Sequence, residues 1–169
     1  MSVELDKNYQ PNEVEPRIYK MWEESGAFAP AIDKSKKPFT ITLPPPNITG
    51  DLHFGHVSFL AYSDMYGRFW RMKGRPTLLL PGTDHSAIST QVLVEKLIAK
   101  EGLKRQDLGR EKFLERVWEF VNTYRPRIQQ QIRAIGVSAD WSRERFTLDE
   151  TIEKSVKQFF ADLKRDGLL

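Results

Sequence analysis

The chain has 169 residues, of which 40% are hydrophobic and 11% aromatic, and this is enough apolar material for one compact domain with its own core. It has no cysteine and three histidines, which excludes disulfides, thiolate zinc sites and thiol nucleophiles, and no metal site is expected. The net charge of +3 allows a phosphate-bearing partner, but basic and acidic residues are interleaved along the chain. Charge alone therefore does not select a function.

The sequence shows no sign of a membrane segment or of export. No apolar run approaches the roughly eighteen residues that a bilayer-spanning helix needs. The first residues, "MSVELDKNYQ", carry acidic side chains where a signal peptide would have a basic and then an apolar stretch. We therefore expect a cytoplasmic protein with no membrane partner.

The N-terminal segment predicts a separate helix. Residues 12–25 place apolar side chains at helical spacing, with Asn12 as a candidate N-cap and Gly26 as the stop. A polar linker follows. We expect residues 1–36 to form an N-terminal helical appendage and linker, and residues 37–169 to form the main domain.

The next segments predict a strand, loop and helix, twice in succession. Residues 39–43, "FTITL", favour a strand that ends at a run of three prolines. A helix follows over residues 52–73 with Asp51 as a possible N-cap, then a strand over 76–80 and a helix over 86–100. This order is typical of an α/β fold with a parallel sheet and crossover helices.

The remaining chain predicts mostly helix. A helix over residues 110–125 meets Pro126, which either kinks it or starts a new helix that ends at Gly136. The stretch "GVSADWSRERFTLDE" predicts irregular or partly extended structure, and we interpret its Asp-Trp-Ser-Arg turn as structural. A last amphipathic helix has its apolar face at Ile152, Val156, Phe159, Phe160 and Leu163.

The two predicted strands end in "PPPNITGDLHFGH" and "PGTDHS", and all three histidines lie in these loops. Ligands of open α/β sheets bind beyond the carboxyl ends of the strands. His53 and His56 share one face at a helix start, beside backbone N–H groups without helical partners, and this favours an anion site. Gly55 leaves room for a flat ring such as a purine. The alternative is that both histidines only cap and pack the helix.

Three further residues in the loops have two interpretations each. Asp84 could receive a substrate ammonium, or it could cap the helix that follows. Asn47 could bind a polar substrate group while Pro45 forms a rigid apolar wall, or both could serve only the turn. The sequence leaves these alternatives open.

The string "HFGH" resembles the His-Ile-Gly-His signature of class I aminoacyl-tRNA synthetases, and the wider sequence is similar to that of the valyl-tRNA synthetases. The resemblance continues through "MKGRPTLLLPGTDHSAISTQVLVEKLIAKEG", "DLGREKFLERVWEF" and "GVSADWSRERFTLDE", from about Tyr9 onward. Two positions depart from the family pattern. Phe54 replaces the usual aliphatic residue or Met, and Ala87 stands where the family commonly has Gly.

The resemblance implies a catalytic centre built from the two loops. His53 and His56 would contact the phosphates of ATP and stabilise the charge that develops as the valine carboxylate attacks the α-phosphorus. The implied ATP-binding residues are Asn47, Thr49, His53, Gly55 and His56. The implied amino-acid-binding residues are Pro45, Asn47 and Asp84, with Asp84 on the ammonium of valine. ATP would bring Mg²⁺ on its phosphates, and no residue is expected to bind a metal directly.

The resemblance further implies half of a Rossmann-type parallel sheet with crossover helices, preceded by the N-terminal helix. The partners would be valine and tRNA(Val), and we expect the chain to be an N-terminal portion that lacks the C-terminal half of the synthetase. Two other functions remain open. One is an ATP-binding module without turnover, and the other is a different histidine-motif nucleotidyltransferase acting on a small acid.

Overall fold

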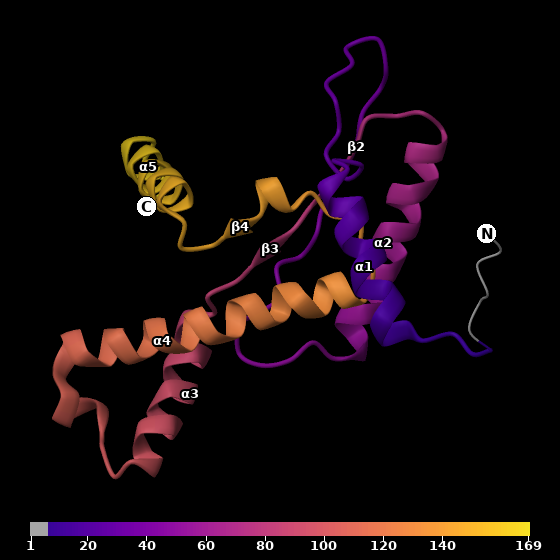
Figure 1. Ribbon diagram of the computed structural model, residues 1–169. Helices are drawn as coiled ribbons and strands as arrows, with labels where there is room; N and C mark the ends of the chain where they lie inside the picture. Colours follow the sequence, from indigo (N-terminus) through magenta and orange to yellow (C-terminus); the bar gives the residue numbers. More distant parts are fainter. Residues whose placement is uncertain (1–6) are drawn as a thin grey trace.

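The computed structural model describes residues 7–169 and contains helices and short parallel strands (Figure 1). The elements in chain order are α1 (Pro11–Glu24), β1 (Phe39–Thr42), α2 (Phe54–Met72), β2 (Thr77–Leu80), β3 (Gly82–Thr83), α3 (Ala87–Lys100), α4 (Arg105–Ala134), a short 3-10 helix (Trp141–Arg143), β4 (Arg145–Phe146) and α5 (Glu150–Arg165). Within residues 7–169, no helix combines the length and the apolar character that a membrane crossing requires.

The strands β1 and β2 pair in parallel, in a register that places Phe39 opposite Thr77 and Thr42 opposite Leu80. Helix α2 connects them and packs on the sheet, as the predicted strand and helix order requires. The packing is close at Gly67, where an added Cβ would lie 2.8 Å from Cδ1 of Leu79. Because the strands are parallel, the loops that follow them emerge at the same edge of the sheet.

A second parallel pair, β3 with β4, extends the line of β2. The backbone nitrogen of Asp140 donates to Leu79 O (3.0 Å), that of Arg145 to Pro81 O (3.2 Å) and that of Thr147 to Thr83 O (3.2 Å). The segment predicted as irregular or partly extended therefore runs alongside residues 79–83. This pairing places Thr147 at the end of β3.

The core lies between the sheet, α2 and α4, and a smaller cluster joins α3 to α4. The main cluster consists of Leu43, Ile48, Leu60, Leu79, Val121, Ile128, Ile132, Val137, Ala139 and Phe146. The smaller cluster consists of Val94, Ile98, Phe113 and Phe120. Thus α4 is shared by both clusters and holds the two parts of the chain together.

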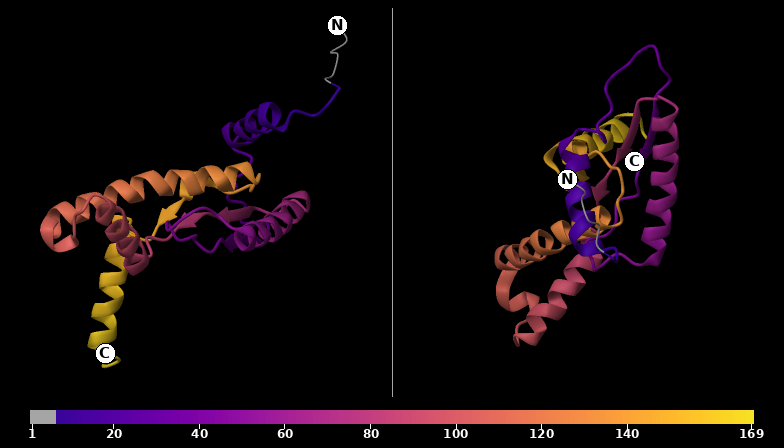
Figure 2. Two further views of the ribbon diagram at one scale, coloured as in Figure 1. Left: turned by 90° about the horizontal axis from the view of Figure 1, so that it is seen from below. Right: turned by 45° about the vertical axis from the view of Figure 1, so that its right-hand side comes forward.

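Helix α1 docks on the segment after α4 through specific polar contacts. The buried Tyr19 hydroxyl donates to Val137 O (2.8 Å) and accepts from Trp141 Nε1 (2.8 Å). Two guanidinium nitrogens of Arg133 donate to the two carboxylate oxygens of Glu23, each at 3.1 Å. Figure 2 shows α1 beside the C-terminal part of α4.

Three helix boundaries differ from prediction. The N-cap of α1 is Gln10 and not Asn12, because Pro11, which has no N–H to satisfy, occupies the first turn. The N-cap of α2 is His53 and not Asp51. Helix α4 starts at Arg105, has a non-helical residue at Gly109 and continues through Pro126 to Ala134.

The C-terminal helix α5 extends away from the rest of the molecule (Figures 1 and 2). None of its described residues is buried, although its predicted apolar face is present. Val156, Phe159 and Phe160 are all about half exposed. The helix therefore owes little of its stability here to tertiary packing, and its local ion pairs, such as Lys154 with Glu150 at 2.5 Å, contribute only modestly.

We predict that Gly82→Ala destabilises the fold. An added Cβ at Gly82 would lie 2.8 Å from the carbonyl oxygen of Arg145, a paired backbone atom that cannot move without disturbing the β3–β4 ladder. The expected loss in the free energy of unfolding, measured by urea denaturation, is about 1 to 3 kcal/mol. Gly50→Ala is the control, because a Cβ there meets nothing within 4 Å. Equal stability of the two variants would contradict this account.

Candidate active site at the strand ends

The loops that follow β1 and β2 are joined by backbone hydrogen bonds. The nitrogen of Asp84 donates to Pro46 O (2.8 Å), and the nitrogen of Ile48 donates to Asp84 O (3.0 Å). Asn47 and Asp84 thus form an isolated parallel bridge beyond the sheet. Ile48 is fully buried and fixes the first loop to the core. The structure therefore brings Asn47 next to Asp84, as a shared site requires.

Pro45 belongs to the same group of residues. Its Cβ lies 3.5 Å from the position that a Cβ of Gly82 would occupy. The side chains of Pro45 and Asn47 are exposed, and that of Asp84 is partly exposed. The three residues predicted for the amino-acid site therefore lie together and are accessible at the surface.

His53 and His56 form the capping structure of α2. Nδ1 of His53 accepts a hydrogen bond from the backbone nitrogen of Gly55 (3.1 Å), and Nδ1 of His56 accepts one from the nitrogen of His53 (3.3 Å). The ring centroids lie 4.0 Å apart. The two histidines can therefore cap the helix and also bind an anion, because capping uses only Nδ1 of each ring.

The capping bonds also determine which atoms are left to bind a ligand. A neutral imidazole whose Nδ1 accepts must carry its proton on Nε2. Each ring therefore presents one Nε2–H donor. The expectation that the backbone N–H groups at this terminus are free needs correction, because the nitrogens of His53 and Gly55 are already bonded to the rings.

Gly55 is exposed and lies directly against the His53 ring. A Cβ at this position would lie 3.0 Å from Cε1 and 3.1 Å from Nδ1 of His53. Such a contact is tighter than ordinary van der Waals packing, so a larger residue would move the ring from its capping position. Gly55 thus has a structural reason to be glycine, in addition to any space that it leaves for a ligand.

The pKa of His56 is lowered, first by burial of the ring and second by the positive charge that His53 can carry. Both causes disfavour the imidazolium form of His56. The ring is therefore a neutral Nε2–H donor at neutral pH.

The turn before the histidines is held by α4. The side-chain oxygen of Gln131 accepts from the nitrogen of Leu52 (2.9 Å), and its Nε2 donates to Asp51 Oδ1 (2.7 Å). Nη2 of Arg127 donates to Asp51 Oδ2 (2.6 Å). Sequence reasoning missed Gln131 and Arg127 because they lie far along the chain from the loop, in a helix without any local motif.

Within the described part of the chain, the hydrogen bonds of the Asp84 side chain all involve Oδ1. Its Oδ1 accepts from the nitrogen of Ser86 (3.2 Å) and from the hydroxyl of Thr147 (3.0 Å). The N-cap of α3 is Ser86, in a left-handed conformation with φ 44°, so the predicted alternative of Asp84 as the cap is wrong. Thr147 is a second residue that sequence reasoning missed, since only the β3–β4 pairing brings it to this loop.

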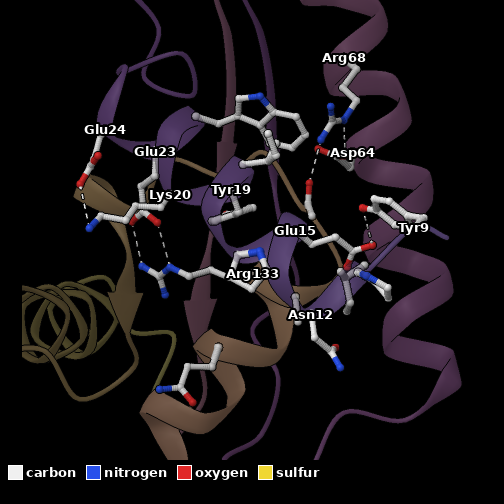
Figure 3. A pocket seen from close by; sticks show the side chains of 18 residues that line it. Tyr9, Asn12, Glu15, Tyr19, Lys20, Glu23, Glu24, Asp64, Arg68 and Arg133 are labelled. Carbon is white, nitrogen blue, oxygen red and sulfur yellow. Dashed lines mark hydrogen bonds and ion pairs between the residues drawn. The ribbon is translucent and has the colours of Figure 1, made fainter. Parts of the chain in front are cut away.

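A hollow of about 1150 Å³ lies elsewhere, between α1, α2 and α4 (Figure 3). Among its lining residues, Arg68 Nε donates to Asp64 Oδ2 (2.6 Å) and Arg133 pairs with Glu23. It includes none of the predicted site residues. Residues 7–169 also contain no cluster of His, Asp and Glu suited to a metal ion.

The family model for class I tRNA synthetases (I, L, M and V) matches residues 17–169. The chain belongs to this family. Among curated proteins, the Valine--tRNA ligase of Clostridium acetobutylicum is 54% identical over 166 residues, which are 98% of this chain and 19% of the relative. The chloroplastic/mitochondrial Valine--tRNA ligase 2 of Arabidopsis thaliana is 52% identical over 155 residues, which are 92% of this chain and 16% of the relative.

A solved structure supports the fold of this class I synthetase domain. The LeuRS of Agrobacterium radiobacter K84, in a ternary complex with tRNA and LeuAMS, superposes with a TM-score of 0.72 at 20% identity. The match covers 95% of this chain and 18% of that one. The predicted α/β fold of a class I synthetase is therefore confirmed. The chain spans about a fifth of the length of the curated relatives named above.

The Asp-Trp-Ser-Arg turn of this synthetase domain is packed into the structure. Asp140 is 3% exposed, its Oδ1 accepts from the nitrogen of Ser142 (3.1 Å), and its other oxygen pairs with Arg143. Trp141 is stacked under the Arg133 guanidinium, 3.8 Å from the ring centroid. These contacts support the structural interpretation of the turn.

We predict that His53→Ala raises the pKa of His56, because it removes the neighbouring positive charge and exposes the His56 ring. Because the rest of the fold still covers part of the His56 ring in the variant, its pKa should stay below the ordinary histidine value of about 6.5. In the parent, the folded pKa lies below the unfolded one, so the unfolded state binds more protons and stability should fall as the pH drops below about 6.5. An NMR titration of His56 measures the shift, and a lower pKa in the variant would contradict it.

We also predict that Gln131→Met loosens the turn before the histidines. The variant keeps the side-chain length but provides no acceptor for Leu52 N–H and no donor for Asp51. Hydrogen exchange at the Leu52 amide should become about tenfold faster or more, as expected for a lost hydrogen bond. Gln130→Met is the matched control because Gln130 is exposed and adjacent. Unchanged protection at Leu52 would show that Gln131 does not hold the turn.

Proposed function

We propose that these residues form the first part of the catalytic domain of a valine–tRNA ligase and contribute to the formation of valyl-adenylate from ATP and valine. The paired histidine cap carries the proposal, because it leaves two Nε2–H donors at the end of the loop that is bridged to Asp84 through Asn47. Family membership and the names of the relatives support it. Since the chain spans about a fifth of those relatives, we propose tRNA(Val) as the acceptor for the whole synthetase.

His53 and His56 would bind the phosphates of ATP. A carboxylate oxygen of valine attacks the α-phosphorus, and the bond from that phosphorus to the pyrophosphate oxygen breaks. Negative charge builds on the phosphate oxygens in the transition state, and fixed donors stabilise it without reorganisation. The capping bonds supply this fixation, because each ring is held by its Nδ1 while its Nε2–H remains available.

Other residues of the first loop would complete the nucleotide site. Gly55 would leave the helix start open to the adenine ring, while Asn47 and Thr49 would provide polar contacts. Asn47 is exposed and Thr49 is partly exposed. Mg²⁺ would be carried on the ATP phosphates, which are its usual ligands in such sites.

The second loop would receive valine. Asp84 would bind the ammonium group through Oδ2, since its Oδ1 already accepts from Ser86 and Thr147. Pro45 and Asn47 would border the same space, Pro45 as an apolar wall and Asn47 as a hydrogen-bonding group. Binding of ATP and valine on joined loops would align the two reactants, and alignment is a large part of catalysis in such transfers.

For ATP, we predict that titration perturbs the ring resonances of His53 and His56 before those of His85. The physical reason is that the rings of His53 and His56 lie at the helix terminus with Nδ1 bonded to the backbone, which leaves Nε2–H to bind a phosphate. Histidine NMR spectra of the chain test this, with inorganic sulfate as a control for general anion binding. Unchanged His53 and His56 signals at millimolar ATP would contradict the proposal.

For valine, we predict that Asp84→Asn weakens binding about 10- to 100-fold, the range expected for a lost hydrogen bond between charged groups. Calorimetry with valine measures the loss. 3-Methylbutanoate, which lacks the ammonium group, should bind the parent and the variant alike. If the variant binds valine like the parent, Asp84 does not hold the ammonium. If ATP perturbs the histidines but the parent does not bind valine, the ATP-binding module without turnover is favoured.

A further inference from the structure

Thr147 lies where three polar groups of the second loop meet. Its hydroxyl oxygen is 3.0 Å from Asp84 Oδ1, 2.9 Å from the backbone nitrogen of His85 and 2.5 Å from Nδ1 of the His85 ring. The backbone of Thr147 is itself fixed, because its nitrogen donates to Thr83 O at 3.2 Å. The β3–β4 pairing therefore carries the hydroxyl to this position.

The chemistry of a hydroxyl group determines how these three contacts are made. A hydroxyl has one proton to donate and two lone pairs that accept. The backbone nitrogen of His85 can only donate, and the carboxylate of Asp84 can only accept. The hydroxyl proton of Thr147 therefore goes to Asp84, and one lone pair accepts from the His85 backbone.

One lone pair remains for the ring of His85. Since the hydroxyl proton is already used, Nδ1 of His85 must carry a proton and donate to Thr147. The opposite assignment would give the hydroxyl proton to Nδ1 and leave two oxygens 3.0 Å apart, Asp84 Oδ1 and Thr147 Oγ1, without a proton between them. Only the first assignment satisfies all three contacts.

We propose that Thr147 is a positioning residue of the amino-acid site, which fixes His85 in the Nδ1–H tautomer and holds Asp84 by one oxygen. Asp84 Oδ2 is then left for the ammonium of the amino acid, and His85 presents an unprotonated Nε2. The part of this inference that concerns the ammonium rests on the proposed function. The part that concerns the tautomer rests only on the contacts of Thr147.

The surroundings of the cluster fit this role. The side chains of Asp84 and His85 are 33% and 30% exposed, so a ligand can reach them. The His85 ring stands edge-on to the buried Phe146, at 6.4 Å between centroids, which restricts its movement. Among residues 7–169, Asp84 Oδ2 has no hydrogen-bond partner, while Oδ1 accepts two hydrogen bonds.

The histidines themselves provide the first test. Long-range hydrogen–nitrogen correlation spectra in alkaline buffer, where imidazoles are neutral, report the protonated nitrogen of each ring. We expect Nδ1–H for His85, and Nε2–H for His53 and His56, whose Nδ1 atoms accept from backbone. A parent His85 that is protonated at Nε2 would overturn the inference, whatever the variants show.

Two variants separate the hydroxyl from the packing of Thr147. Thr147→Val preserves the shape and removes the hydroxyl, so the Nδ1–H signal of His85 should weaken relative to Nε2–H, because only Asp84 Oδ1, 3.4 Å from Nδ1, is left to accept from it. Thr147→Ser restores the hydroxyl and should restore the Nδ1–H signal. Unchanged His53 and His56 spectra show that the variants are folded. The same His85 tautomer in the folded Val variant as in the parent would refute the positioning role.

The same variants test whether the Thr147 hydroxyl contributes to the binding of valine. Thr147→Val should weaken valine binding about tenfold, the cost of losing one hydrogen bond to a charged group, and Thr147→Ser should bind like the parent. If the parent binds valine and Thr147→Val binds it equally, Thr147 does not position Asp84. If the tautomers behave as expected and the parent does not bind valine, the failure belongs to the proposed function and the tautomer assignment stands.

Discussion

Two backbone hydrogen bonds, Asp84 N to Pro46 O and Ile48 N to Asp84 O, determine the arrangement of the candidate site. They continue the parallel pairing of β1 and β2 beyond the sheet, into segments that would otherwise be free loops. Ile48, fully buried, connects this extension to the core. The backbone that carries the polar side chains at the strand ends is therefore held as rigidly as the sheet. Mobile loops would not hold these side chains in place.

The histidine signature shows how one set of bonds can serve both folding and chemistry. Helix N-termini leave N–H groups without partners, and here the rings of His53 and His56 satisfy two of them. Because each ring has two nitrogens, satisfying the backbone with Nδ1 leaves Nε2–H for a ligand. A capping aspartate would satisfy the helix equally well, but its carboxylate only accepts hydrogen bonds and would present no donor to a ligand.

The elements that depend on local patterns could be predicted from the sequence. The alternation of "FTITL" and the apolar spacing of α2 located the first strand and helix to within about two residues, because these signals lie in the residues themselves. Gln131 and Thr147 could not be predicted in the same way. Each reaches its loop only through long-range pairing, Gln131 from 79 residues away, and neither has a local signature. Pro126 is a further case, because α4 continues through it, between the buried residues Val121 and Ile128, and its non-helical residue is Gly109.

The backbone environment gives the three histidines two different roles. Near His53 and His56 the groups that need a partner are backbone N–H donors at the helix start. Nδ1 of each ring accepts from one of them, so Nε2 keeps the proton. Near His85 the hydroxyl of Thr147 accepts a hydrogen bond from Nδ1–H, so Nε2 carries no proton and becomes an acceptor. Donors suit the phosphates of a nucleotide, whereas an acceptor beside a carboxylate suits an ammonium group. The chemical difference between the two loops thus follows from which backbone and hydroxyl groups each ring must satisfy, before any ligand is bound.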